Sequence, residues 1–279
     1  EEVRSAVKEE LQDILNEAVK VASTPINEYK QPEVVIPKPT PTTPVATALV
    51  AGTDQAGTAG ADSFSGTVAT LTSNTTLVGT DDIAGGEGAD TIALALGANF
   101  GGFTTTGTDT GSMTGIETVE LSATGSIART FDATGVSGVE TYKVDGTNAV
   151  VSITGSADLA AIELSSMASG AFSITYAAPT GGTSPVAGTA DTLNLTVQGM
   201  GSATADVAVT AAGVEALSIT SNAAATAAGA TNYLDVSGVS SATSTTIAGA
   251  ADTDIAAVST ATTAFDASGV TGAVTAALG

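Results

Sequence analysis

The chain has 279 residues, 29 of them acidic and seven basic, and a formal net charge of −22. It contains no histidine, cysteine or tryptophan. This inventory excludes an imidazole base, a thiolate nucleophile, disulfides and an ordinary zinc site, and it leaves calcium and other hard cations with oxygen ligands as the suitable metals.

Residues 1–24 are predicted to be an amphipathic α-helix that ends a helical anchor domain. Apolar residues recur at helical spacing, with charged residues on the other face. The apolar positions are Val3, Val7, Leu11, Ile14, Leu15, Ala18 and Val19. This stripe needs a partner, which could be an upstream helical domain, a neighbouring subunit or a flank of the region that follows.

Residues 25–45 are predicted to be an extended linker. Six of the eight prolines lie between Pro25 and Pro44, and proline fixes φ and removes backbone donors. A recruitment site for a proline-reading module is the alternative for this segment.

Residues 46–279 are predicted to form a right-handed parallel β-helix. The composition changes to Gly, Ala, Thr, Ser and Val, and alternating phrases such as "TVELSA" and "TLNLTV" are typical of strands with one face inward. Glu117, Glu140 and Glu163 follow one another at equal intervals, which suggests successive coils of a solenoid. These glutamates could form an acidic ladder or lie at solvated edges.

Three recurring phrases, "FDATGVSG", "LDVSGVSS" and "FDASGVTG", place an aspartate after a large apolar residue. We expect these aspartates, Asp132, Asp235 and Asp266, to cap turns by accepting hydrogen bonds from backbone amides. No apolar stretch approaches the roughly 18 residues of a membrane span, so no transmembrane segment is expected. The acidity of residues 46–279 makes nucleic acid an unfavourable partner.

Calcium binding is predicted from three nonapeptides. "GGEGADTIA", from Gly85, matches G-G-x-G-x-D-x-U-x at every specified position, whereas "TLVGTDDIA", from Thr76, keeps three of those positions. The third, "GTAGADSFS", begins at Gly57. Such repeats form parallel β-helices that bind calcium.

The predicted metal ligands are four aspartates together with the backbone of nearby glycines. If each nonapeptide makes a half-coil, two half-coils and one extra loop residue bring Asp62 beside Asp81, and Asp90 beside Asp109. The glycines that open the turns and aim carbonyl groups are Gly60, Gly79, Gly85, Gly86 and Gly88. The alternative is that these aspartates are ordinary turn residues.

The nonapeptides, the Ala/Thr/Gly/Ser-rich body and the repeated "FDASGVTG" and "GIETVEL" phrases resemble calcium-dependent RTX-type surface-layer (S-layer) proteins of Gram-negative bacteria. The resemblance implies a non-enzymatic structural subunit, exported by type I secretion, that assembles on the cell surface into a homo-oligomeric lattice or filament. It also implies attachment to surface polysaccharide through an N-terminal domain, so we expect the chain to be part of a longer protein.

Two other functions remain open at this point. An RTX adhesin would attach cells to surfaces, and the secretion domain of an extracellular enzyme would carry a catalytic motif upstream. In each case a low-volume, acidic chain is expected to stay expanded until calcium binding contributes to folding.

Overall fold

The computed structural model describes residues 8, 11–16, 44–123, 126–145, 150–179, 182–224 and 231–278. Contacts divide the chain into Glu1–Thr40 and Pro41–Gly279. In the first unit residues 8 and 11–16 are helical. The remainder of the predicted helix and almost all of the predicted linker lie outside the described residues. Within the described part of the chain, no helix is long and apolar enough to cross a membrane.

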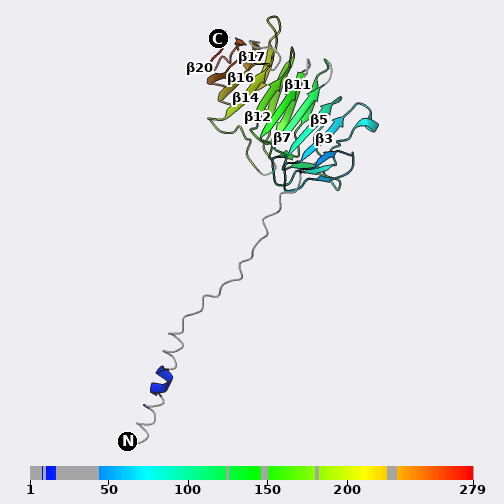
Figure 1. Ribbon diagram of the computed structural model, residues 1–279, viewed down its shortest axis with the longest axis vertical. Coiled ribbons are helices and arrows are strands. Elements are labelled where there is room, and N and C mark those ends of the chain that lie inside the picture. The colour runs from blue at the N-terminus through cyan, green and yellow to red at the C-terminus, as the bar shows by residue number, and fades with distance from the viewer. Residues whose placement is uncertain are drawn as a thin grey trace. The chain divides into compact units, whose positions relative to one another are not determined.

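The second unit is a parallel β-solenoid of about nine turns (Figure 1). Its described strands pair in parallel within three sheets of ten, seven and four strands. The ten-stranded sheet A contains, in spatial order, β1 (Ala46–Ala48), β3 (Ser63–Val68), β5 (Thr91–Leu96), β7 (Thr118–Ala123), β10 (Thr141–Asp145), β12 (Ala161–Ser165), β14 (Thr192–Gln198), β16 (Ala216–Asn222), β18 (Ser244–Gly249) and β20 (Ala264–Val270).

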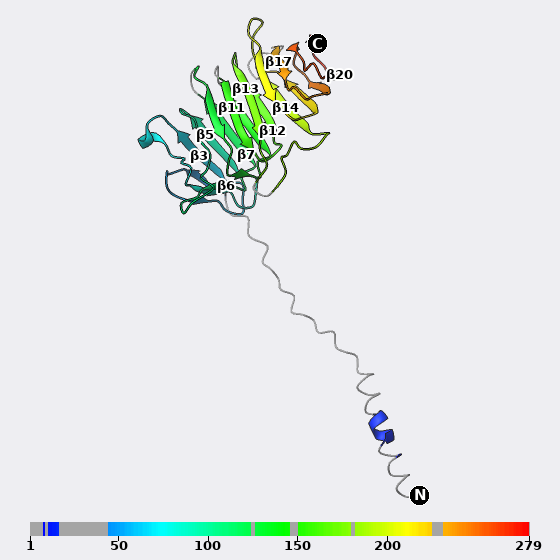
Figure 2. The same cartoon turned by 180° about the vertical axis from the view of Figure 1, so that it is seen from behind.

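Two further sheets complete the coils. The seven-stranded sheet C contains β8 (Arg129–Asp132), β11 (Val150–Ser156), β13 (Ala171–Tyr176), β15 (Val207–Ala211), β17 (Asn232–Gly238), β19 (Thr253–Ala257) and β21 (Val274–Ala276). The short sheet B, whose β6 is labelled in Figure 2, contains β2 (Gln55–Ala56), β4 (Asp82–Ala84), β6 (Ser112–Thr114) and β9 (Val136–Ser137), so it spans only the first coils.

The interior is built from alternate residues of each strand, as the sequence predicts. In β5, Ile92, Leu94 and Leu96 are buried, whereas the residues between them are half-buried on the outer face. Because every coil contributes a few β-branched or leucine side chains, the core is one continuous column along the stacked coils. Four aromatic side chains are in ring contact in this core: Phe100, Phe103, Phe131 and Tyr142, with the ring centroids of Phe100 and Phe131 5.3 Å apart.

Coil length varies along the solenoid. Thr118 of β7 pairs with Thr141 of β10, and Thr141 pairs in turn with Ala161 of β12. The first of these steps places Glu117 and Glu140 in equivalent positions. The second step is shorter, so Glu163 aligns with Lys143 instead. A ladder of all three glutamates, one of the two alternatives for these residues, is therefore not formed.

The backbone hydrogen bonds of the predicted turn caps are present at all three recurring phrases, but only Asp132 stands at the end of a strand. Oδ1 of Asp132 accepts the backbone N–H of Thr134 at 2.9 Å. Asp235 and Asp266 accept the amides of Ser237 and Ser268 in the same way, at 2.9 and 2.8 Å. Each aspartate satisfies a backbone donor two residues along. Asp132 ends β8, whereas Asp235 and Asp266 lie within β17 and β20, where the pairing register with the neighbouring strand shifts.

Candidate metal-binding turns

A column of carboxylates lies along one edge of sheet A, where the chain turns into its strands. Asp62, Asp90 and Glu117 immediately precede β3, β5 and β7. Each accepts a backbone N–H from the preceding coil: Val45 donates to Asp62 (2.8 Å), Asp62 to Asp90 (2.6 Å) and Asp90 to Glu117 (2.7 Å). Three like charges are therefore held on three successive coils.

Glycine-rich turns lead into this column and lie directly on one another. A Cβ on Gly85 would collide with the backbone carbonyl of Gly115 in the next coil. Gly88 has φ +134°, and its Cβ would lie 2.6 Å from the carbonyl oxygen of Gly60. Glycine is required at these positions because backbone carbonyl groups of one coil approach the backbone of the next. The predicted Gly60, Gly85, Gly86 and Gly88 all belong to these turns.

Asp90 is the member of the column whose bonding is incomplete. Its side chain is completely buried, Oδ1 accepts the Asp62 amide, and Oδ2 has no hydrogen-bond partner. Burial raises the pKa of this carboxyl, and the nearby charges of Glu117 and Asp62 raise it further, against the lowering effect of the Asp62 amide. A buried carboxylate oxygen without a partner is costly, so a positively charged partner would stabilise it.

Asp62 contrasts with Asp90 although it occupies the equivalent position one coil earlier. The backbone N–H of Thr58 donates to Oδ2 of Asp62, and the Thr58 hydroxyl also contacts this carboxylate. These donors, the Thr58 amide first and the Val45 amide next, lower the pKa of Asp62. Asp62 is thus already satisfied as a turn cap by the protein itself.

Asp81 and Asp109 lie away from this column. Asp81 precedes β4 of sheet B, and its two oxygens accept the amides of Gly52 (2.7 Å) and Val78 (2.9 Å). The carbonyl oxygen of the predicted Gly79 accepts the amide of Thr104 at 2.6 Å. Asp109 is exposed. Asp81 therefore has the bonding of a buried turn residue.

The predicted pairing of Asp62 with Asp81, and of Asp90 with Asp109, is wrong. Ser63 pairs with Thr91, so Asp62 lies beside Asp90 of the next coil. The half-coil assumption fails because the intervening segment contains the 3₁₀-helix Thr72–Asn74 and the sheet B strand β4 before the chain returns to sheet A. Two of the predicted ligands are still brought together, in a different combination.

Glu117 was not among the predicted metal ligands, yet it is the neighbour of Asp90. The sequence feature that could have identified Glu117 is its position in "GIETVEL". It stands one residue before strand β7, as Asp90 stands one residue before β5. The arrangement recurs farther along, where Oε2 of Glu215 accepts the amide of Asp191 at 3.0 Å. An acid before a sheet A strand is therefore a repeated device for closing the junction between coils.

The donor set fits a calcium ion at Asp90 better than at the other predicted ligands. Its unpaired Oδ2 and the glycine-exposed carbonyl groups beside it are oxygen donors, the kind that calcium takes. In the described part of the chain, however, no group of three or more acidic residues is arranged to hold a metal. Any ion there would depend on backbone carbonyls for most of its ligands.

Comparison with known proteins gives no relative: no protein-family model, curated protein or solved structure matches this chain.

Proposed function

We propose that the chain is part of a non-enzymatic structural subunit of a secreted, calcium-dependent surface layer. The observation that carries the proposal is Asp90, a fully buried carboxylate with one oxygen unpaired, between two other carboxylates on a stack of glycine-rich turns. The parallel solenoid and the nonapeptides are consistent with RTX-type calcium turns, which is the reason for choosing calcium among the hard cations.

In this proposal Asp90 provides the central ligand, and the turns of residues 57–62 and 85–90 provide backbone carbonyls. Calcium supplies two positive charges and accepts six to eight oxygen ligands. The residues of this chain hold the carboxylates in line: the Asp62 amide orients Asp90, and Glu117 orients the backbone of Asp90 from the next coil. Neutralising this column would remove the repulsion between charges on adjacent coils.

The overall charge connects this site to assembly. Residues 46–279 carry 21 acidic and two basic side chains, so copies of the chain repel one another until cations neutralise part of that charge. Ion binding to the folded state alone adds to its stability by mass action. Low calcium would therefore keep the chain unassembled, and high calcium outside the cell would favour both folding and lattice formation.

The test compares Asp90→Asn with Asp254→Asn, a matched charge removal on β19 of sheet C. Calcium binding is measured by isothermal titration calorimetry, and order by circular dichroism and electron microscopy with calcium or with a chelator. We expect the wild type and Asp254→Asn to bind calcium and to form chelator-sensitive arrays. Asp90→Asn is expected to lose at least tenfold in affinity.

Two results would refute the proposal. One is the absence of calcium binding by the wild type at millimolar calcium. The other is binding with equal affinity by Asp90→Asn, which would place the ion elsewhere. Calcium binding without any ordered array would retain the metal site but refute the surface-layer function.

A further inference from the structure

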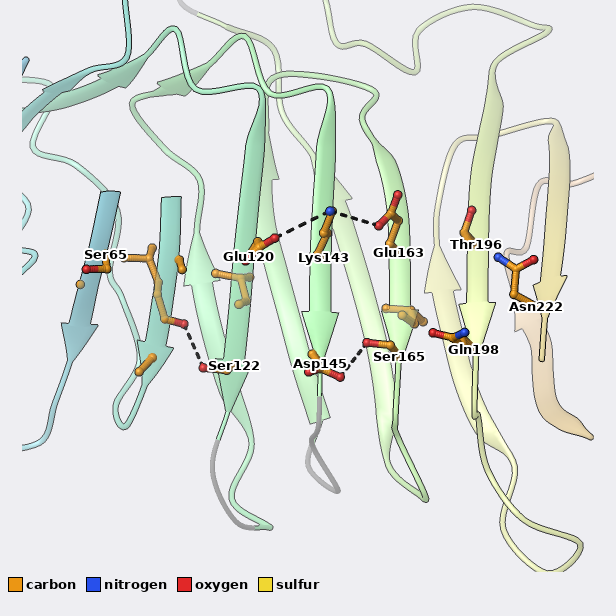
Figure 3. Close-up of a pocket in the computed structure, with 16 residues that line it drawn as sticks. Ser65, Glu120, Ser122, Lys143, Asp145, Glu163, Ser165, Thr196, Gln198 and Asn222 are labelled. Carbon is orange, nitrogen blue, oxygen red and sulfur yellow. Dashed lines mark hydrogen bonds and ion pairs between the residues drawn. The ribbon is translucent and has the colours of Figure 1, made fainter. Parts of the chain in front are cut away.

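A groove with a volume of about 710 Å³ crosses the outer face of sheet A (Figure 3). It extends from β3 to β16, so its long direction runs across the strands, along the stack of coils. It shares no residue with the carboxylate column of Asp62, Asp90 and Glu117. The groove is therefore a second feature of the molecule, and a ligand bound there does not contact the proposed calcium ligands.

Strand register arranges the groove side chains in two parallel rows. The first row comprises Ser65, Ala93, Glu120, Lys143, Glu163 and Thr196. The second comprises Ala95, Ser122, Asp145, Ser165, Gln198 and Asn222. Neighbouring members are one strand apart, about 4.8 Å. Most carry a hydroxyl, carboxylate, amide or ammonium group, so the groove presents hydrogen-bonding groups at a regular interval.

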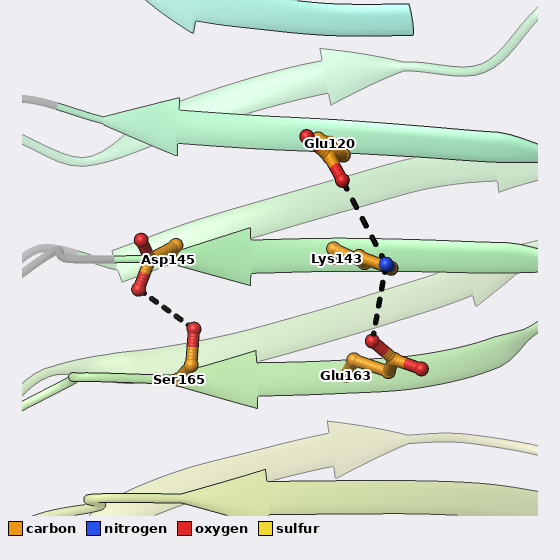
Figure 4. Close-up of polar contacts among 5 residues, drawn as sticks. All are labelled: Glu120, Lys143, Asp145, Glu163 and Ser165. Carbon is orange, nitrogen blue, oxygen red and sulfur yellow. Dashed lines mark hydrogen bonds and ion pairs between the residues drawn. The ribbon is translucent and has the colours of Figure 1, made fainter. Parts of the chain in front are cut away.

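The centre of the groove is held in place by its own polar contacts (Figure 4). Nζ of Lys143 lies 3.7 Å from a Glu120 oxygen and 3.6 Å from a Glu163 oxygen, and these three side chains are 41–46% exposed. In the second row the Ser165 hydroxyl donates to Asp145 at 2.7 Å. Lys143 is one of only two basic residues after position 38. The chain thus places a scarce cation where it orients two carboxylates that still face solvent.

We propose that this groove binds a neutral polysaccharide, with the sugar chain running along the two rows. The strand spacing is close to the length of one pyranose unit, so successive sugars can meet successive strands. Hydroxyl, carboxylate and amide groups are suited to pairing with sugar hydroxyls. Among the described residues that line the groove none is aromatic, so recognition rests on hydrogen bonds rather than on ring stacking.

The charge of the groove favours a neutral glycan over an anionic polysaccharide or a second copy of the chain. Three carboxylates against one ammonium group disfavour an anionic polysaccharide. A second copy of the chain is disfavoured for the same reason as long as cations do not neutralise its strongly acidic β region. A protein interface would also have to bury the Glu120, Lys143 and Glu163 charges, which is costly. A neutral glycan leaves these groups partly hydrated, and its hydroxyls donate hydrogen bonds to the carboxylates and accept them from the ammonium group.

The experiment measures retardation of the protein in native gels that contain dextran, laminarin, yeast mannan or, as the anionic comparison, alginate. Thr196→Tyr places a bulky side chain at the end of the first row, beside Glu163, and Glu163→Gln removes one acceptor charge. Asp254→Asn, in sheet C, is the matched control. Circular dichroism and the thermal midpoint establish that each variant is folded, and size-exclusion chromatography measures self-association.

We expect at least one neutral polysaccharide to retard the wild type and the control equally, and alginate to have no effect. Thr196→Tyr should abolish the retardation, and Glu163→Gln should weaken it about tenfold. The proposal is overturned if no neutral polysaccharide retards the wild type, or if folded Thr196→Tyr is retarded as strongly. It is also overturned if Thr196→Tyr abolishes a dimer without changing retardation, because the groove would then be an interface between copies.

Discussion

Two junctions between stacked coils, one in the first coils and one near the last, are closed with different chemistry. In the first coils, carboxylates receive backbone amides from the coil before, and Asp90 keeps a buried oxygen without a partner. In the later coils a junction between the end of β16 and the starts of β17 and β19 is neutral. The Asn232 amide donates to Ser221 at 2.8 Å, the Thr253 hydroxyl also donates to Ser221 at 2.7 Å, and all three side chains are at most 1% exposed.

The difference shows where the molecule is sensitive to its surroundings. An ion does not stabilise a neutral network in which every polar group is paired, and the contribution of such a network to stability does not change with pH. A stack of like charges with an unpaired oxygen is stabilised by whatever neutralises it. We therefore expect the junction at Asp90 to respond to cations and the neutral junction at Ser221 to remain unaffected.

The largest expected loss of stability comes from a steric clash at the junction of the early coils. Gly85→Ala places a Cβ against the backbone carbonyl of Gly115, and a rigid backbone cannot move away cheaply, so unfolding should become easier by roughly 3 kcal/mol. The control is Gly101→Ala, because a Cβ at Gly101 meets nothing within 4 Å. Urea denaturation measures both, and equal stability of the two variants would contradict the close stacking of these turns.

A titration at high pH tests the core between the two junctions. Burial raises the pKa of Tyr142 to about 12. The raised value means that the neutral hydroxyl stabilises the folded chain below pH 10, and that this stability is lost as pH rises from about 10 to about 12. The loss is about 3 kcal/mol for a shift of two units. Tyr142→Phe should remove this part of the loss when unfolding is followed by circular dichroism. It should also remove the smaller part of the raised Tyr176 pKa that comes from Tyr142, while the larger part, from burial, remains.

The neutral junction is broken by Asn232→Ala. The amide of Met200 loses its acceptor, the Asn232 oxygen at 2.9 Å, and Ser221 loses a donor, so about 2 kcal/mol of stability should be lost. The control is Asn194→Ala on the exposed face of β14, which should change stability little. The loss should be the same with calcium and with a chelator, and a calcium-dependent loss would contradict the contrast between the two junctions.

The smallest expected effect on stability is that of removing the charge of Asp266, which is exposed in β20. The hydroxyl and then the amide of Ser268 lower the pKa of this carboxyl. Because a lowered value favours the ionised form in the folded state, its contribution is present above the ordinary carboxyl pKa and is lost as pH falls. Asp266→Asn should lower the thermal midpoint slightly at pH 7 and not at pH 2, measured by differential scanning calorimetry.

The features of this molecule that its sequence predicts correctly are those set by neighbouring residues along the chain. Alternation predicts which side chains of β5 face inward. The three recurring phrases predict the backbone amide bonds that Asp132, Asp235 and Asp266 accept. These features depend on chain geometry within a few residues, so they survive any arrangement of the coils.

The amino-acid sequence by itself determined the solenoid class, the glycine-rich turns and the aspartates within them. Only the tertiary structure decided which acids stack: Asp62 meets Asp90 and Asp90 meets Glu117, because irregular segments between strands set each coil length. The groove rows also exist only in the folded chain, since they join residues from strands far apart in the sequence. The physical reason is that strand register depends on loop length and long-range pairing, which local patterns do not encode.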